Sequence, residues 1–126
     1  MFAIDTSSLV EFLKGSKGGD IEIIEDALDK HILILPPIVL SEVLSDPKLS
    51  SEIKKILQRI PSLPLVDGFW YRSGILRSKV IEKKRKARLG DALIAQYCID
   101  HGLLLITRDE DFKSFVTVGK LQTSIF

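Results

Sequence analysis

The sequence has a single cysteine, no long apolar run and almost no net charge. Because Cys98 has no partner in the chain, an intrachain disulfide is excluded and a reducing compartment, the cytoplasm, is expected. No apolar run approaches the roughly 20 residues that a membrane-spanning helix needs. The N-terminus lacks the basic and long apolar regions of a signal peptide. The net charge of +1 gives no overall indication of a nucleic-acid partner, so any such site must come from local clustering of charge.

The chain does have the composition of an ordered globular protein. Of its 126 residues, 45% are hydrophobic and 28% are charged. This length suits one domain, which we expect to span residues 1–126. Cys98 is expected in the core. The adjacent aromatic residues Phe69 and Trp70 are also expected there.

Short apolar runs alternate with helical patterns along the chain. Strands are expected at residues 2–4, 32–35, 65–66, 103–107 and 115–118. Helices are expected at residues 9–14, 20–30, 38–44, 47–60, 69–86 and 90–100. Ser8 and Glu11 predict a capping box for the first helix, and Asp20 is expected to cap the second. This alternation predicts an α/β fold, a three-layer α/β/α sandwich with a central parallel sheet.

Four acids lie where the strands of such a sheet end, which is where sites form in these folds. They are Asp5, Glu42, Asp91 and Asp109. Simple capping explains Asp5 or Asp91 taken alone, and a turn or cap explains Asp109. Glu42 is harder to explain, because helical spacing puts it on a face that we expect to be partly buried.

Convergence of these acids would require a positive partner. Carboxylates about 5 Å apart repel by roughly 3 kcal/mol per pair at an effective dielectric near 20. Lysine or arginine could relieve this repulsion, and so could a hard divalent cation, which prefers oxygen ligands. His31 and His101 stand too far apart for zinc-ligand spacing. Mg²⁺ or Mn²⁺ is therefore the metal hypothesis.

Four sequence motifs resemble those of PIN domains. They are residues 4–9 (IDTSSL), 41–44 (SEVL), 90–95 (GDALIA) and 105–112 (LITRDEDF). The resemblance extends from residue 2 to about residue 118. It implies an α/β/α sandwich and a Mg²⁺- or Mn²⁺-dependent endonuclease acting on RNA.

The resemblance also implies roles for individual residues. Asp5, Asp91 and Asp109 match metal ligands, and Glu42 matches a ligand or water-positioning group, completing a catalytic quartet. Three further residues match supporting positions: Ser7, Thr107 and, as a candidate fifth acid, Asp111. Within the family the chain resembles VapC-type toxins, which implies a small antitoxin partner and a homodimer.

Several alternatives stay open. The family also contains RNA-processing nucleases outside toxin–antitoxin pairs, and a PIN-like module could bind RNA or protein without cutting. A phosphotransfer or receiver domain would need adjacent acids after the first strand, which Asp5-Thr6 lacks. The basic run at residues 79–88 offers Lys83, Lys84 and Arg85 as RNA-binding residues. Its simpler interpretation is a solvated helix end.

Overall fold

The computed structural model describes all residues, 1–126, and contains one four-stranded sheet. The strands are β1 (Phe2–Ile4), β2 (Leu33–Ile34), β3 (Leu104–Thr107) and β4 (Thr123–Ile125). They lie in the order β2-β1-β3-β4, and every neighbouring pair is parallel. The carboxyl ends of β1 and β3 therefore meet at one edge, with Ile4 opposite Ile106.

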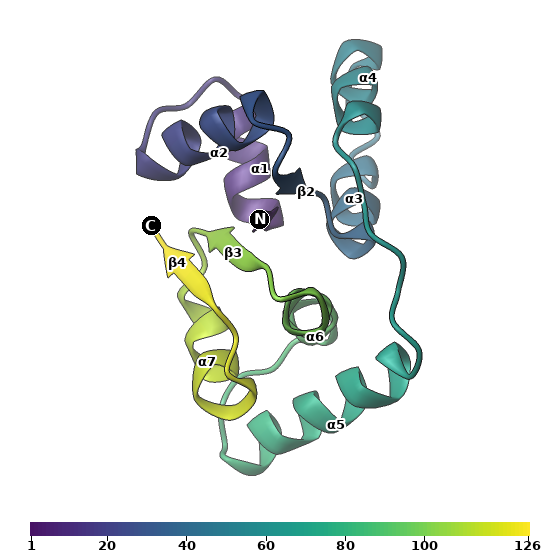
Figure 1. Cartoon of the computed structure of the whole chain (residues 1–126), viewed down its shortest axis with the longest axis vertical. Helices are drawn as coiled ribbons and strands as arrows, with labels where there is room; N and C mark the ends of the chain where they lie inside the picture. The colour runs from purple at the N-terminus through teal and green to yellow at the C-terminus, as the bar shows by residue number, and fades with distance from the viewer.

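Helices cover both faces of this sheet. They are α1 (Thr6–Leu13), α2 (Gly19–Asp29), α3 (Pro37–Leu44), α4 (Ser51–Arg59), α5 (Phe69–Glu82), α6 (Leu89–His101) and α7 (Lys113–Gly119), with a 3₁₀ turn η1 (Glu110–Phe112). Figure 1 shows α1 and α2 on one side of the sheet and α5, α6 and α7 on the other. In this view α3 and α4 stand beside β2. The predicted α/β/α sandwich is confirmed.

The central strands form the middle of the core. Ile4, Leu105 and Ile106 are fully buried, as expected for parallel strands covered on both faces. Cys98 is also fully buried, as predicted, and burial raises the pKa of its thiol. The prediction for the aromatic pair was half wrong. Phe69 is buried but Trp70 is 66% exposed, because successive helical residues point about 100° apart.

Two predicted strands are wrong. Residues 65–66 lie in an exposed loop without strand structure. Residues 115–118 belong to α7, and the edge strand is β4, which follows that helix. The apolar run at 115–118 is too short for periodicity to separate helix from strand.

The predicted helix starts also need correction. The N-cap of α1 is Asp5, so Ser8 lies inside the helix, and its hydroxyl donates to Asp20 at 2.9 Å instead of capping. The N-cap of α2 is Gly18, so Asp20 lies in the first turn. Helix α4 begins later than predicted, after Ser50, which accepts a capping hydrogen bond.

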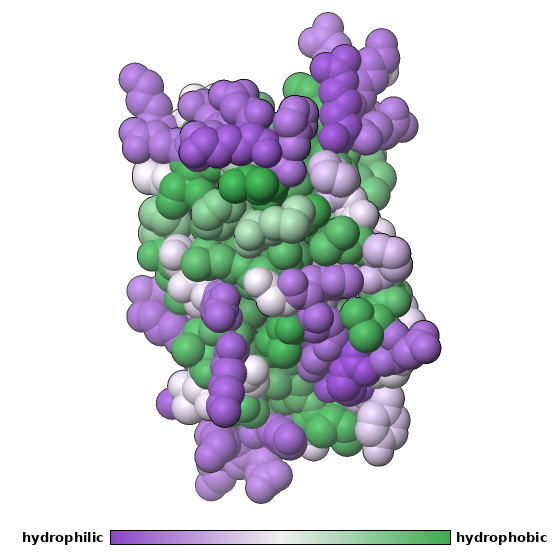
Figure 2. Space-filling view, viewed as in Figure 1, coloured by the Kyte–Doolittle hydropathy of each residue, from purple (hydrophilic) through white to green (hydrophobic).

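Hydrophilic residues lie mainly on the outer helices. Figure 2 shows them at the top of the view, over α2 and the outer end of α4, and again in the lower part of the view, with a largely hydrophobic region between. None of the helices has the length and apolar character needed to cross a bilayer.

Candidate active site

Asp5 is the most buried of the four predicted acids and lies at the carboxyl edge of the sheet. It follows β1 directly and is 4% exposed. Although it occupies the N-cap position of α1, its side chain makes no capping hydrogen bond. Its Oδ2 atom instead accepts hydrogen bonds from the hydroxyls of Ser7 at 2.9 Å and Thr107 at 2.7 Å. Two hydroxyls therefore orient this carboxylate, and Oδ1 is left without a side-chain hydrogen bond.

The end of β3 lies against Asp5. The Thr107 hydroxyl that donates to Asp5 also accepts the backbone N–H of Asp109 at 3.0 Å. Asp109 in turn caps η1, because its Oδ1 atom accepts the N–H of Asp111 at 2.9 Å. The capping interpretation of Asp109 is thus correct for one of its two oxygens, and the Thr107 hydroxyl links the Asp109 backbone to Asp5.

Asp91 lies in the first turn of α6, whose N-cap is Arg88. The interpretation of Asp91 as a plain N-cap is therefore wrong. Burial, followed by the negative charges of Asp109, Asp5 and Glu42, raises its pKa to about 6 against the opposing charge of Arg88. Asp91 therefore lies among other acids in a partly buried position.

Glu42 reaches the same edge from α3. Its expected partial burial is wrong: the residue is exposed, because Val39 and Val43 fill the buried face of the helix. The Thr6 hydroxyl donates to its Oε1 atom at 3.0 Å. Its Oε2 atom lies 3.9 Å from the point where a Cβ on Gly90 would stand. Glu42 therefore lies at the solvent-facing rim of the acids, next to the start of α6.

The candidate fifth acid, Asp111, joins this group. One oxygen each from Asp91, Asp109 and Asp111 lies within 4.8 Å of the others. Asp111 Oδ2 also lies 3.3 Å from the Lys86 ammonium. Sequence reasoning missed Lys86 as a site residue. Its position in the basic run, five residues before Asp91, was the available signal.

The three predicted RNA-binding residues lie beyond the end of α5. Lys83, Lys84 and Arg85 are all exposed and form no salt bridge. Only Lys86, the next residue, contacts an acid of the site. The basic run therefore reaches the acidic group at Lys86, whereas Lys83, Lys84 and Arg85 are exposed to solvent.

The donors in this group suit a hard divalent cation. Every candidate ligand atom is a carboxylate oxygen, the type that Mg²⁺ and Mn²⁺ prefer. Besides burial, the neighbouring acids Asp109 and Asp5 raise the pKa of Asp91 against the opposing charge of Arg88. The residues present therefore fit such an ion.

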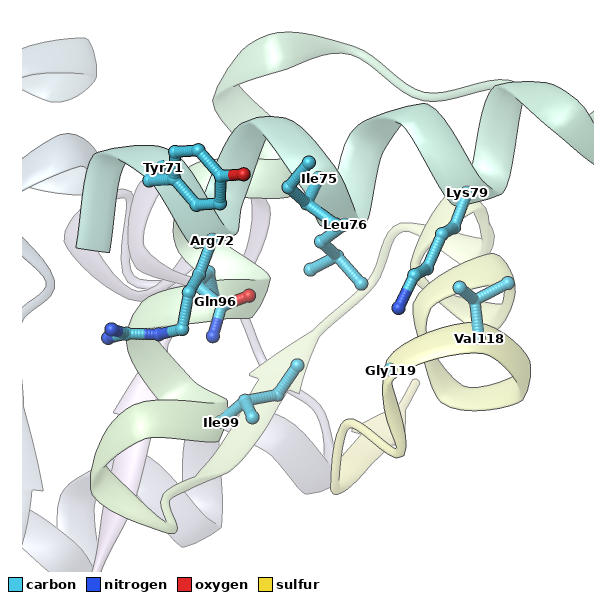
Figure 3. Close-up of a pocket in the computed structure, with 9 residues that line it drawn as sticks. All are labelled: Tyr71, Arg72, Ile75, Leu76, Lys79, Gln96, Ile99, Val118 and Gly119. Carbon is cyan, nitrogen blue, oxygen red and sulfur yellow. The ribbon is translucent and has the colours of Figure 1, made fainter. Parts of the chain in front are cut away.

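A separate hollow lies on the helical side of the molecule. This α5–α7 groove of about 260 Å³ is lined mainly by Tyr71, Ile75, Leu76, Ile99 and Val118. Figure 3 shows the α5 side chains above Ile99 of α6 and Val118 of α7. Ile99 lies eight residues after Asp91 on α6, about 12 Å along the helix. The groove is therefore distinct from the acidic group.

Comparison with known proteins identifies the fold and its family. The PIN-domain family model matches residues 2–116. The chain belongs to the PIN-domain family. The resemblance of the four sequence motifs is thereby confirmed, and the acids described above lie at the carboxyl edge of a PIN-domain sheet.

Individual relatives of this PIN domain cover its whole length. It is 29% identical over 136 residues to Ribonuclease VapC11 of Mycobacterium tuberculosis, covering 100% of this chain and 99% of the relative. A chain of the VapBC2 complex of Rickettsia felis, crystallised with a promoter DNA fragment, superposes with a TM-score of 0.77 at 21% identity, covering 99% and 98% of the two chains. A chain of DNA-bound VapBC from Salmonella typhimurium also gives 0.77, at 18% identity, covering 98% and 96%.

Proposed function

We propose that this PIN domain is a metal-dependent endoribonuclease and the toxin of a type II toxin–antitoxin pair. One observation carries the proposal: acids from four separate segments converge, and their mutual repulsion helps to raise the pKa of Asp91 to about 6. Full-length similarity to a relative named as a VapC ribonuclease supports it. The proposal treats residues 1–126 as one domain acting in the cytoplasm.

The acids have different proposed roles that follow from their positions. Asp5, Asp91 and Asp109 would hold Mg²⁺ or Mn²⁺, and Glu42 at the solvent-facing rim would complete the ligands or orient the attacking water. When bound, the ion supplies an activated water and stabilises charge on the phosphate oxygens. Ser7 and Thr107 orient Asp5 through their hydrogen bonds to Oδ2.

Lys86 has a place in the same reaction. Its ammonium lies against Asp111 and is 57% exposed at the side chain, so an RNA phosphate can approach it from solvent. A phosphodiester of RNA offers charged oxygens that accept charge-assisted hydrogen bonds from an ammonium. Lys86 would therefore bind the backbone of RNA next to the acids.

Cleavage of single-stranded RNA by the purified chain tests the reaction. We expect cleavage with Mg²⁺ or Mn²⁺, none after chelation by EDTA, and recovery when the ion is restored. The Asp5→Asn variant should be inactive. RNA binding without cleavage in the parent would favour the binding-module alternative.

The basic run provides a test of the RNA contact. Replacing Lys83, Lys84 and Arg85 by glutamine should weaken RNA binding several-fold. It should also flatten the dependence of log affinity on log salt by up to about 2, since each phosphate contact on a single strand contributes about 0.7. An unchanged slope would mean that these residues form only a solvated helix end.

An antitoxin partner is the second part of the proposal. A groove of about 230 Å³ between α1, α3 and α4 is lined by Val10, Leu13, Val43, Leu49 and Ile53 and opens beside Glu42. An apolar segment of an antitoxin could cover it and block the site. We expect the product of a short adjacent gene to co-purify with this chain and to inhibit cleavage. Active chain without any such partner would favour an RNA-processing role.

The proposal also includes a homodimer. Trp70, Tyr71 and Ile75 are large apolar side chains on α5 that the single chain leaves exposed. Light scattering during gel filtration should give twice the mass of the chain. Replacing Trp70 and Tyr71 by serine should shift the mass toward the monomer, whereas a monomeric parent would remove this part of the proposal.

A further inference from the structure

Asp20 is a buried acid that the proposed reaction does not use. It is 1% exposed and lies in the first turn of α2. Its carboxylate accepts hydrogen bonds from the Arg108 guanidinium, from Nε at 2.6 Å and from Nη2 at 2.9 Å. The Ser8 hydroxyl donates a third at 2.9 Å. The bond from Arg108 lowers the pKa of Asp20, so the two side chains form an ion pair at neutral pH.

The backbone of Arg108 belongs to the acidic site. The residue stands between Thr107, which donates to Asp5, and Asp109, which lies with Asp91 and Asp111. Its own N–H donates to the Ser7 hydroxyl at 3.0 Å, and that hydroxyl donates to Asp5 at 2.9 Å. A shift of the Arg108 backbone would therefore disturb both hydroxyls that orient Asp5.

The side chain of Arg108 anchors this backbone to α2. Besides binding Asp20, Nη2 donates to the carbonyl of Lys17 at 3.2 Å. Gly18 provides the room for these contacts, since a Cβ there would stand 2.7 Å from Asp20 Oδ1 and 2.9 Å from Arg108 Nη2. Arg108, which directly follows β3, thus binds Asp20 of α2, which lies 88 residues earlier in the chain.

Stability alone gives a weak reason for such a pair. Burying the Asp20 carboxylate costs desolvation energy, and apolar residues of similar size often stabilise a protein as much as a buried ion pair does. The chain contains a second pair for comparison: Arg72 of α5 binds Asp100 of α6, with an Nη2–Oδ2 distance of 2.5 Å. Figure 3 shows Arg72 at the α5–α7 groove, on helices rather than at the end of a strand. The Arg72–Asp100 pair therefore serves as a matched control.

We propose that Asp20 is a positioning residue for the acidic site. By holding the Arg108 guanidinium against α2, it fixes residues 107–109 and so keeps Asp5 and Asp109 at a spacing that binds a divalent ion. This inference rests on the proposed metal-dependent function.

Direct titration of Mn²⁺ into the full chain, followed by calorimetry, tests the inference without relying on activity. We expect Asp20→Asn to raise the Kd for Mn²⁺ about 10-fold, the effect typical of residues that orient metal ligands. The control Asp100→Asn should leave this Kd unchanged, while both variants lower the thermal midpoint. An unchanged Kd in the Asp20→Asn variant, or an equal rise in the control, would overturn the inference.

A second variant covers the case in which Asp20→Asn does not fold. Arg108→Lys keeps the charge beside Asp20 but loses the two-pronged hydrogen bonding of the guanidinium. We expect a folded protein with a smaller rise in the Kd for Mn²⁺, and a Kd equal to that of the parent would reject the inference. A parent that binds Mn²⁺ and cleaves RNA keeps the proposed function whichever result follows. A parent that does neither would remove the proposed function itself.

Discussion

The acidic site and the α5–α7 groove both have carboxylates at or beside them, but these carboxylates have different partners. Beside the groove, the carboxylate of Asp100 accepts hydrogen bonds from Arg72 and from the Gln96 amide. At the sheet edge, Asp91 has its pKa raised to about 6 by burial and neighbouring acids. The groove, of about 260 Å³, has the cations Arg72 and Lys79 but no carboxylate among its lining residues. A cluster of acids, rather than the size of a hollow, distinguishes the site.

The largest effect on RNA cleavage is expected from the replacement of a central acid. Asp91→Asn should lower RNA cleavage by about 100-fold or more, because it removes one charge from the proposed ion site while keeping the shape of the side chain. Asp100→Asn, the equivalent change at the α5–α7 groove, should leave cleavage near the parental rate. Initial rates at saturating Mn²⁺ measure both. Equal losses of cleavage in the two variants would mean that the acidic site and the α5–α7 groove do not differ in function.

A smaller effect is expected when the support of an acid is removed. Thr107→Val deletes the hydroxyl that donates to Asp5 and accepts from the N–H of Asp109. Cleavage should fall about 10- to 100-fold, the usual range for residues that orient ligands. Ser73→Ala, which removes a buried hydroxyl bonded to the Phe69 carbonyl within α5, is the matched control. Similar losses of activity in both variants would indicate general destabilisation.

The acidic site should also make the stability of the protein depend on pH, because Asp91 binds its proton more tightly in the folded chain than in the unfolded one. The free energy of unfolding of the metal-free protein should therefore decrease as pH rises from about 4 to about 6, and stay lower above that range. Cation binding needs the ionised carboxyl, so cleavage at pH 5 should be about 10-fold below its plateau. Urea unfolding and rate profiles measure the two effects. If the Asp91→Asn variant kept the same pH-dependent stability, Asp91 would not be the group responsible.

The smallest effect on activity is expected from filling the α5–α7 groove. A Cβ at Gly119 would lie 2.7 Å from Leu76 Cδ1 and 3.0 Å from Ile99 Cδ1. Gly119→Ala should therefore lower the free energy of unfolding by about 1–3 kcal/mol and leave the cleavage rate of the folded protein unchanged. Thermal unfolding and initial rates give the two values. A large loss of activity without a loss of stability would show that this groove takes part in the reaction.

The sequence predicted the sheet well where apolar runs end at a polar residue. The strand at residues 2–4 was placed correctly, and β3 began only one residue later than expected. The strands expected at 65–66 and 115–118 were wrong because two to four apolar residues carry no usable period. Buried Ser114 and Phe115 followed by exposed Val116 and Thr117 fit one face of a helix, and only the packed structure reveals this pattern.

The site was predictable in its acids but not in the contacts that hold them. Asp5 and Asp109 follow strands and Asp91 lies in the first turn of a helix, so their approximate places followed from the fold class. The hydrogen bond from Thr6 to Glu42 spans 36 residues, and that from Arg108 to Asp20 spans 88. Such contacts depend on how α1, α2 and α3 pack, which no local pattern encodes. Capping rules even assigned Ser8 and Asp20 to helix starts, whereas they bind each other.

The insertion of β3 between β1 and β4 has a consequence during protein synthesis. Asp5 is synthesised early, but its partner Thr107 and the neighbouring Asp109 follow more than 100 residues later. Until β3 pairs with β1, Asp5 and Glu42 have no strand end to complete their arrangement. The proposed RNA cleavage would therefore be absent from a nascent chain until β3 has left the ribosome and paired.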